Sequence, residues 1–231
     1  MIELFPEGFE EIEHADGVEL VAYTDASGEE RLWHAFGAAR GAEVAEGWED
    51  AWRSFHQPIR VGRLWVGPPW EEPDAGALAV VVDPGRAFGT GSHPTTRLCL
   101  ELLDGLPPGS VLDVGCGSGV LSIAAARLGF GPVKAVDVEE AAVDATRANA
   151  EANGVEIDVS RLDALAEDLP AAELVIANIA LEAVEAVGAK VDAPRLVTSG
   201  YLQSEEPRFS GWRRAERRRS EGWAADLFER I

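Results

Sequence analysis

The chain has 231 residues, 46% of them hydrophobic, which is enough apolar surface for a folded core and excludes bulk disorder. It carries 41 acidic and 20 basic residues, a formal net charge of −21, which opposes direct binding to nucleic acid. The same charge would attract a basic protein partner, although plain solubility explains it equally well. Without an apolar run of ~18 residues or an N-terminal signal segment, and with two cysteines, we expect a cytoplasmic, monomeric protein with neither a membrane span nor a disulfide framework.

Residues 1–57 are predicted to form a small unit that contains both helix and strand. Val18–Thr24 alternates between apolar and polar residues, as a half-buried strand does. Asp25–Gly28 is rich in turn-forming residues, so Arg31–Phe36 is the expected hairpin partner of that strand. Further on, Glu49–Phe55 has the spacing of a short helix with aromatic residues on one face.

A proline-rich stretch separates this unit from the rest of the chain. Residues 58–76 contain a short predicted strand, Arg63–Val66, followed by Pro68–Pro73. Proline disfavours both helices and central strands. We therefore predict a linker at 58–76 between an N-terminal domain, 1–57, and a larger domain, 77–231.

From residue 77 onward, apolar strands alternate with helices, which predicts a mostly parallel sheet covered on both faces. The predicted strands are Ala77–Val82, Val111–Val114, Val133–Val136, Ile157–Ser160, Leu174–Ala177 and Arg195–Ser199. The predicted helices are Thr95–Leu103, Val120–Leu128, Glu139–Asn153 and Leu181–Val187. The chain then ends in an expected antiparallel hairpin, Gly211–Arg219 with Trp223–Glu229, whose five arginines we interpret as a solvated face.

The most informative segment is the run Val-Leu-Asp-Val-Gly-Cys-Gly-Ser-Gly at residues 111–119. A short strand leads into a glycine turn and then into the helix Val120–Leu128, whose N-terminus offers free N–H groups to a ligand. The next strand ends at Asp137, a carboxylate placed to accept the hydroxyls of a ribose. This strand–helix–strand arrangement predicts a site for an adenosine-bearing cofactor.

The glycine spacing indicates which cofactor that is. Glycines 115, 117 and 119 form G-x-G-x-G after Asp113, rather than the G-x-G-x-x-G of dinucleotide-binding proteins. The shorter form is typical of methyltransferases that use S-adenosylmethionine, which has no pyrophosphate to bind. Taken alone, the turn also occurs as a plain strand-to-helix connection in unrelated α/β proteins.

A second signature lies upstream, in the run Asp83–Leu100. Its glycines permit unusual backbone angles, and Pro94 suits the first position of a helix with His93 or Ser92 as the cap. The simplest interpretation is a capped helix after a turn. A glycine-rich loop of this length beside a ligand crevice more often has a function.

This run closely resembles the signature of the bacterial methyltransferases that trimethylate the eleventh protein of the large ribosomal subunit, the PrmA family. The resemblance extends over roughly residues 48–231. It includes Trp48–Gly62, Asp113–Gly119, Asp137, Asn149–Gly154 and Ala177–Ile179. It implies a class I methyltransferase fold of the α/β type, a Rossmann-like sheet with an antiparallel C-terminal hairpin. It also implies a small, shortened N-terminal α+β domain.

The resemblance also implies which residues form the site. The cofactor contacts that it carries over are Thr96, Gly115, Asp137 and Asn178. Asp113 and Gly117, from the same glycine turn, are added as cofactor-binding residues, and Phe88 and His93 are expected to wall the same pocket. The cofactor implied is S-adenosylmethionine, no metal is expected, and the substrate is a basic ribosomal protein presented by residues 1–57.

Methyl transfer from a sulfonium to an amine is an in-line displacement that depends mainly on alignment. We expect Asn178 to be the catalytic residue, orienting the substrate amine through its side-chain carbonyl, although a strand-end cap is the simpler role for an asparagine there. His93 is the candidate general base near the site. The predicted function is methylation of lysine and N-terminal amines of that ribosomal protein. The alternatives are another protein-lysine substrate, such as an electron-transfer flavoprotein, or a noncatalytic cofactor-binding module.

Overall fold

The computed structural model describes residues 10–14, 17–21, 26–36, 57–83 and 91–231, with side chains from residue 31 onward. The chain divides into two compact units, Met1–Trp52 and Arg53–Ile231. Each unit is described by itself. The described residues contain no helix long and apolar enough to cross a membrane.

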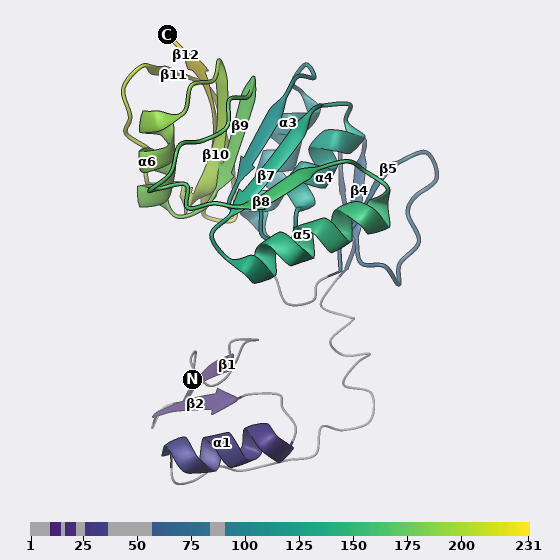
Figure 1. The fold of residues 1–231 in the computed structure, drawn as a ribbon, viewed down its shortest axis with the longest axis vertical. Helices are drawn as coiled ribbons and strands as arrows, with labels where there is room; N and C mark the ends of the chain where they lie inside the picture. Colours follow the sequence, from purple (N-terminus) through teal and green to yellow (C-terminus); the bar gives the residue numbers. More distant parts are fainter. Residues whose placement is uncertain (1–9, 15–16, 22–25, 37–56, 84–90) are drawn as a thin grey trace. The chain divides into compact units, whose positions relative to one another are not determined.

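In the N-terminal unit, two antiparallel strands precede a helix. β1 (Glu10–His14) pairs with β2 (Gly17–Val21), and α1 spans Ala26–Phe36 (Figure 1). The predicted turn at 25–28 and the predicted hairpin strand at 31–36 are therefore wrong. Apolar residues at 32, 33 and 36 fit the helical spacing of three to four as well as they fit alternation, and a helix satisfies its backbone hydrogen bonds without a partner strand. The predicted helix at 49–55 lies outside the described residues.

The larger unit is built on a seven-stranded sheet in the order β11-β12-β10-β9-β6-β7-β8. Five consecutive strands of this sheet run parallel to one another, namely β8, β7, β6, β9 and β10. β12 pairs antiparallel with β10, and β11 pairs antiparallel with β12, so the sheet ends in the antiparallel hairpin that was predicted. The strands are β6 (Val111–Val114), β7 (Val133–Asp137), β8 (Asp158–Arg161), β9 (Leu174–Asn178), β10 (Arg195–Leu202), β11 (Trp212–Ser220) and β12 (Trp223–Arg230). The near-continuous apolar runs of β6 and β9 are explained by this arrangement, because a central parallel strand is covered on both faces.

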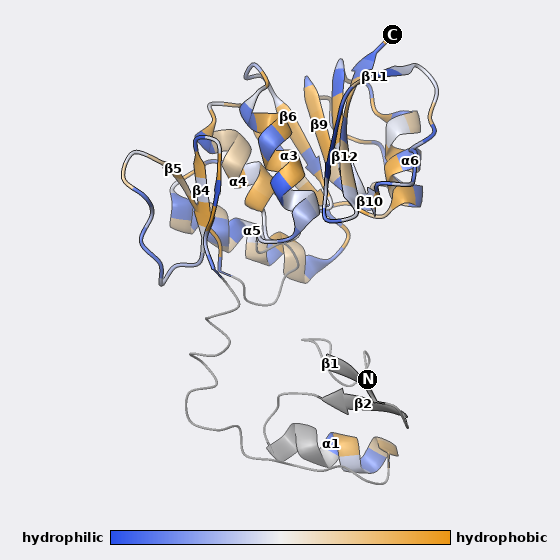
Figure 2. Ribbon diagram, turned by 180° about the vertical axis from the view of Figure 1, so that it is seen from behind, coloured by the Kyte–Doolittle hydropathy of each residue, from blue (hydrophilic) through white to orange (hydrophobic). Residues whose placement is uncertain are grey.

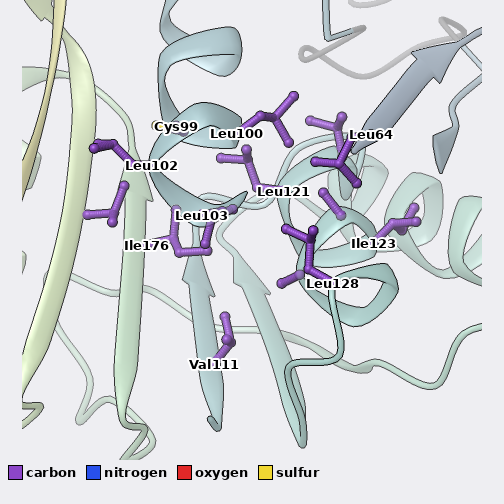
Figure 3. Packing of buried hydrophobic residues seen from close by; sticks show 14 of the residues in the cluster. Leu64, Cys99, Leu100, Leu102, Leu103, Val111, Leu121, Ile123, Leu128 and Ile176 are labelled. Atoms are coloured by element: carbon purple, nitrogen blue, oxygen red, sulfur yellow. The ribbon is translucent and has the colours of Figure 1, made fainter. Parts of the chain in front are cut away.

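Helices cover both faces of this sheet. They are α3 (Pro94–Asp104), α4 (Val120–Arg127), α5 (Glu140–Asn153) and α6 (Leu181–Lys190). Leucines of α3 and α4 pack with Val111 and Ile176 of the sheet on one face (Figure 3). The other face of the same strands packs on α6, where Leu112 and Val175 meet Val184. Figure 2 shows the apolar residues concentrated along these strands and on the helix faces turned toward them.

A second, three-stranded sheet differs from what the sequence predicts. β3 (Ile59–Val61) pairs antiparallel with β4 (Leu64–Gly67), and β4 pairs in parallel with β5 (Leu78–Val81). β5 was expected in the large sheet. Residues 58–76, expected to be a linker, contain β3 and β4, and the side chains of Leu64 and Val66 are buried in the same core as α3 and α4. This burial of apolar side chains holds the stretch in the larger unit.

The C-terminal hairpin forms where predicted, but its arginines are not all solvated. Arg217 has a side chain that is 6% exposed, and its Nη1 lies 3.3 Å from Oδ2 of the fully buried Asp226. The hydroxyl of Tyr201 donates to the same oxygen at 2.9 Å. Burial raises the pKa of Asp226, with the hydrogen bond from Tyr201 and the nearby arginines acting in the opposite direction. The basic run therefore includes one arginine that neutralises a buried acid.

Candidate cofactor and methyl-transfer site

A cavity of about 1140 Å³ opens at the carboxyl ends of the parallel strands. Residues after β7 and β8 form one end of it, and residues from β9, β10, β12 and the start of α3 form the other. Of the residues predicted for the site, its wall contains Thr96, Gly115, Gly117, Asp137, Asn178 and His93. Phe88 lies outside the described residues. The sequence motifs, which span more than 80 residues, thus meet in one hollow.

The glycine turn lies between β6 and α4. Gly115, Gly117 and Gly119 all have positive φ, at 73°, 56° and 82°, which is the left-handed region that glycine adopts without steric cost. A Cβ on Gly115 would lie 2.4 Å from Cγ2 of Ile179, so a side chain there would displace the residue after Asn178. The turn is therefore tied to the segment that follows β9.

Asp137 ends β7 and is fixed from two sides. Its Oδ2 accepts a hydrogen bond from the N–H of Gly117 at 3.0 Å, and its Oδ1 accepts one from the N–H of Glu139, also at 3.0 Å. A carboxylate offers about four acceptor positions, so each oxygen keeps a further one. The side chain is held rigidly beside the cavity and can still accept two more hydrogen bonds.

Asp113 is placed differently from the other predicted residues. It is 1% exposed, and among the described residues it is absent from the cavity wall. It accepts a hydrogen bond from the hydroxyl of Ser122 at 2.5 Å. Burial raises its pKa to about 6, and the charge of Asp137 adds to the rise while the Ser122 hydrogen bond opposes it. The structure thus gives Asp113 a place beneath the glycine turn, where it joins β6 to α4.

At the other end of the cavity, none of the described residues that line it carries a carboxylate. Asn178 closes β9, and its Nδ2 donates to Oγ1 of Thr96 at 3.4 Å. Thr96 is 2% exposed and lies in the first turn of α3. Because this contact uses the amide nitrogen of Asn178, the amide oxygen remains the acceptor at this position.

His93 is the N-cap of α3, with Pro94 as the first helical residue, as the sequence predicts. Its Nδ1 accepts from the backbone N–H of Thr95 at 3.3 Å and lies 2.7 Å from the Thr95 hydroxyl. With Nδ1 accepting, the neutral ring carries its proton on Nε2. The ring also stands edge-on to Trp223, 5.0 Å between centroids at 68°.

Several residues of the cavity wall were not predicted from the sequence. They are Asp163, Leu165, Gly200 and Trp223. Gly200 has φ of 100° at a bulge in β10, and a Cβ there would lie 2.0 Å from the carbonyl oxygen of Ile179. Asp163 follows β8 much as Asp137 ends β7, which is the one signal that could have indicated it. Trp223 carries no local signal, since it merely opens the last strand.

Comparison with known proteins agrees with this geometry. The chain is 44% identical over 177 residues to a ribosomal protein L11 methyltransferase of Shewanella pealeana, covering 71% of this chain and 60% of that protein. It is 53% identical over 141 residues to the one of Symbiobacterium thermophilum, covering 58% and 46%. It thus spans about 60% or less of the length of these curated relatives.

Among solved structures, a ribosomal protein L11 methylase from Lactobacillus delbrueckii subsp. bulgaricus superposes with a TM-score of 0.67 at 27% identity, covering 76% of this chain and 99% of that one. A putative RNA methyltransferase from Pyrococcus horikoshii shares the fold alone, with a TM-score of 0.51 at 18% identity over 63% of this chain and 87% of that one. The family described as ribosomal protein L11 methyltransferase (PrmA) matches residues 12–224. The chain belongs to this family.

Proposed function

We propose that the protein is an S-adenosylmethionine-dependent methyltransferase that methylates lysine and N-terminal amines of ribosomal protein L11. The observation that carries the proposal is the pairing of Asp137 and Asn178 at opposite ends of one cavity, with the glycine turn between them. Membership of the family supports the reaction class and the substrate. Such a substrate would place the enzyme in the cytoplasm.

The residues present fit the cofactor. The free acceptor positions of Asp137 suit two ribose hydroxyls, and the glycine turn lets the backbone approach a ligand without side chains in between. Asp163, after β8, lines the same end of the cavity, where its Oδ1 accepts from the backbone N–H groups of Leu165 and Ala166. S-adenosylmethionine, when bound, supplies an electrophilic methyl group on a positively charged sulfur.

The chain must then hold a neutral amine against that methyl group. A lysine has a reference pKa of about 10.4 and an α-amine one of about 8, so the substrate has to lose a proton before it reacts. A carboxylate next to the amine would favour the charged form, whereas an amide oxygen accepts a hydrogen bond from the neutral amine without a full negative charge. We assign this role to the amide oxygen of Asn178, which Thr96 orients by occupying the amide nitrogen.

His93 is better suited to shape the site than to act as a base. Its Nδ1 is engaged by Thr95, so Nε2 carries the proton in the neutral ring and cannot accept another. The ring and Trp223 form an apolar, aromatic edge of the cavity that limits access of water to the amine. The proton of the amine leaves to solvent before the amine is enclosed.

Substrate recognition is assigned to the N-terminal unit. The family match begins at residue 12, inside that unit, which favours the ribosomal protein over a flavoprotein substrate. The formal charge of −21 would speed the encounter with a basic partner. In this proposal residues 1–57 hold the ribosomal protein and the larger unit binds the cofactor and carries out the transfer.

The decisive experiment is incubation of the full chain with purified, unmethylated ribosomal protein L11 and isotope-labelled S-adenosylmethionine, followed by mass spectrometry of the product. We expect label on lysine side chains and on the N-terminal amine, and far slower labelling with an Asn178→Ala chain as control. Cofactor binding without label on L11, but with label on another protein, would keep the reaction and replace the substrate. Cofactor binding without transfer to any protein would favour the noncatalytic alternative.

A further inference from the structure

Helix α5 carries three buried polar side chains on one face, and none of them belongs to the site as described so far. Thr146, Asn149 and Asn153 follow each other at spacings of three and four residues, with exposures of 0%, 6% and 6%. Buried polar groups are unfavourable unless they are hydrogen-bonded, so the partners of these side chains should explain their presence. Those partners lie in the glycine turn and at the end of β5.

Two of the three side chains bind consecutive carbonyl groups of the glycine turn. The hydroxyl of Thr146 donates to the carbonyl oxygen of Gly117 at 2.9 Å, and Nδ2 of Asn149 donates to the carbonyl oxygen of Ser118 at 2.9 Å. Together they fix two successive peptide planes. The left-handed glycines on either side of Ser118 do not restrict their own backbone, so the turn needs such outside contacts to keep one shape.

This part of the turn is also the part that holds Asp137. The N–H of Gly117 donates to Oδ2 of Asp137, so a change in the backbone angles of Gly117, whose carbonyl Thr146 holds, displaces this contact as well. Thr146 packs closely here as well, because a Cβ on Gly119 would lie 2.9 Å from its Cγ2. The α5 side chains thus act on the cofactor end of the cavity through the backbone, without lining it.

Asn149 makes a second contact that joins two signatures of the sequence. Its Oδ1 accepts from the backbone N–H of Asp83 at 3.2 Å, and Asp83 begins the glycine-rich run that leads to His93 and α3. One amide therefore bridges the base of that run and the glycine turn. Asn153 contacts β5, where its Oδ1 accepts from Val81 N at 2.9 Å and its Nδ2 donates to Val81 O at 2.6 Å. The same Nδ2 donates to the backbone carbonyl oxygen of Asn149 at 2.7 Å, within α5.

We propose that Thr146 and Asn149 are positioning residues of the cofactor site, which hold the carbonyls of Gly117 and Ser118 and thereby keep the turn and Asp137 in the shape that binds an adenosine sulfonium. This inference rests on the proposed function. Because the site is formed before the cofactor arrives, loss of either contact lowers the population of the competent turn, and the apparent affinity falls by the same factor. The reacting groups at Asn178 remain untouched.

The test compares variants that each remove or keep one donor group. Thr146→Val keeps the shape of the side chain and removes the hydroxyl, whereas Thr146→Ser keeps the hydroxyl. Asn149→Asp keeps the acceptor for Asp83 and loses the donor for Ser118. Asn153→Asp is the matched control, since it lies on the same face with the same exposure as Asn149 and loses donors to β5 and to the backbone of α5, but none to the glycine turn.

For each variant, the affinity for S-adenosylhomocysteine is measured by calorimetry well below the lowest melting temperature, and KM for S-adenosylmethionine and kcat are measured on the full chain. We expect Thr146→Val and Asn149→Asp to weaken binding about tenfold and to raise KM similarly with kcat unchanged, because a buried carbonyl is left without its donor. Thr146→Ser should bind within about threefold of the parent, and Asn153→Asp should lose thermal stability yet bind within about threefold.

Equal affinity in Thr146→Val, Asn149→Asp and the parent would overturn the inference, as would equal weakening in all variants including Asn153→Asp. Either result would leave the proposed function intact, because the parent chain would still bind. A parent chain that binds no S-adenosylhomocysteine would overturn the proposed function and this inference with it.

Discussion

The two ends of the cavity are built from opposite kinds of group. At one end, Asp137 is a full charge held by two backbone N–H groups. At the other, Asn178 and Thr96 present neutral polar groups beside the aromatic rings of His93 and Trp223. A fixed charge suits ribose hydroxyls, which keep their protons. Neutral polar and aromatic side chains suit an amine that has to give up its proton.

The difference between the two ends of the cavity is reduced most if a negative charge is placed at position 178. Asn178→Asp is nearly isosteric, but its carboxylate would stabilise the ammonium form of the substrate amine. We expect kcat to fall by roughly a hundred- to a thousandfold, as when a preorganised polar group is removed at a reacting centre, and the optimum to move to higher pH. Cofactor affinity should change by less than about threefold. Stopped-flow or mass spectrometry measures turnover, and calorimetry measures cofactor affinity. Equal turnover of variant and parent at saturating substrate would remove Asn178 from the mechanism.

A second variant tests whether Asp113 binds the cofactor together with Asp137 or has a structural role. The pKa of Asp113 is raised from 3.8 to about 6, so its contribution to stability is present below about pH 3.8 and is lost as pH rises through about 6. This difference in pKa corresponds to about 3 kcal/mol of free energy. We expect Asp113→Asn to gain unfolding free energy relative to the parent by about that amount between about pH 4 and about pH 7.5, measured by urea titration. A large loss of cofactor affinity without this pH dependence would instead place Asp113 in the binding site.

The charged end itself is tested with Asp137→Ala. Two hydrogen bonds to ribose hydroxyls would be lost, and bonds to a charged group contribute about 1.5–3 kcal/mol, so affinity should fall about ten- to a hundredfold. In contrast to Asn178→Asp, kcat at saturating cofactor should stay within about threefold of the parent. Calorimetry with S-adenosylhomocysteine measures the first, and an unchanged dissociation constant would move the ribose site elsewhere.

The smallest effect is expected at His93. Asparagine is a good N-cap, so His93→Asn should keep the melting temperature and the pH profile of kcat close to those of the parent, whereas His93→Ala should lose about 1 kcal/mol of stability. A general base would show the reverse, with His93→Asn losing turnover and the acid limb of its pH profile. Thermal denaturation and the dependence of kcat on pH decide between the two.

Features that depend on local pattern could be predicted from the amino-acid sequence. The alternation of strands and helices, the left-handed glycines before α4, Asp137 at the end of β7 and the cap of α3 all depend on neighbouring residues, and each is found where it was predicted. Parallel strands also bring their carboxyl ends to one edge, so the meeting of Gly115, Asp137 and Asn178 followed from the predicted topology alone.

Features that depend on contacts between distant residues became visible in the folded structure. α1 replaces a predicted strand because a six-residue apolar pattern fits both periods, and β3 and β4 join the core because α3 and α4 offer them an apolar surface. Arg217 is buried because Asp226, on the neighbouring strand, needs a counter-charge. Trp223 enters the cavity wall because the hairpin returns beside α3, more than a hundred residues from the glycine turn. No local pattern encodes such pairings, since their free energy exists once both partners are in place.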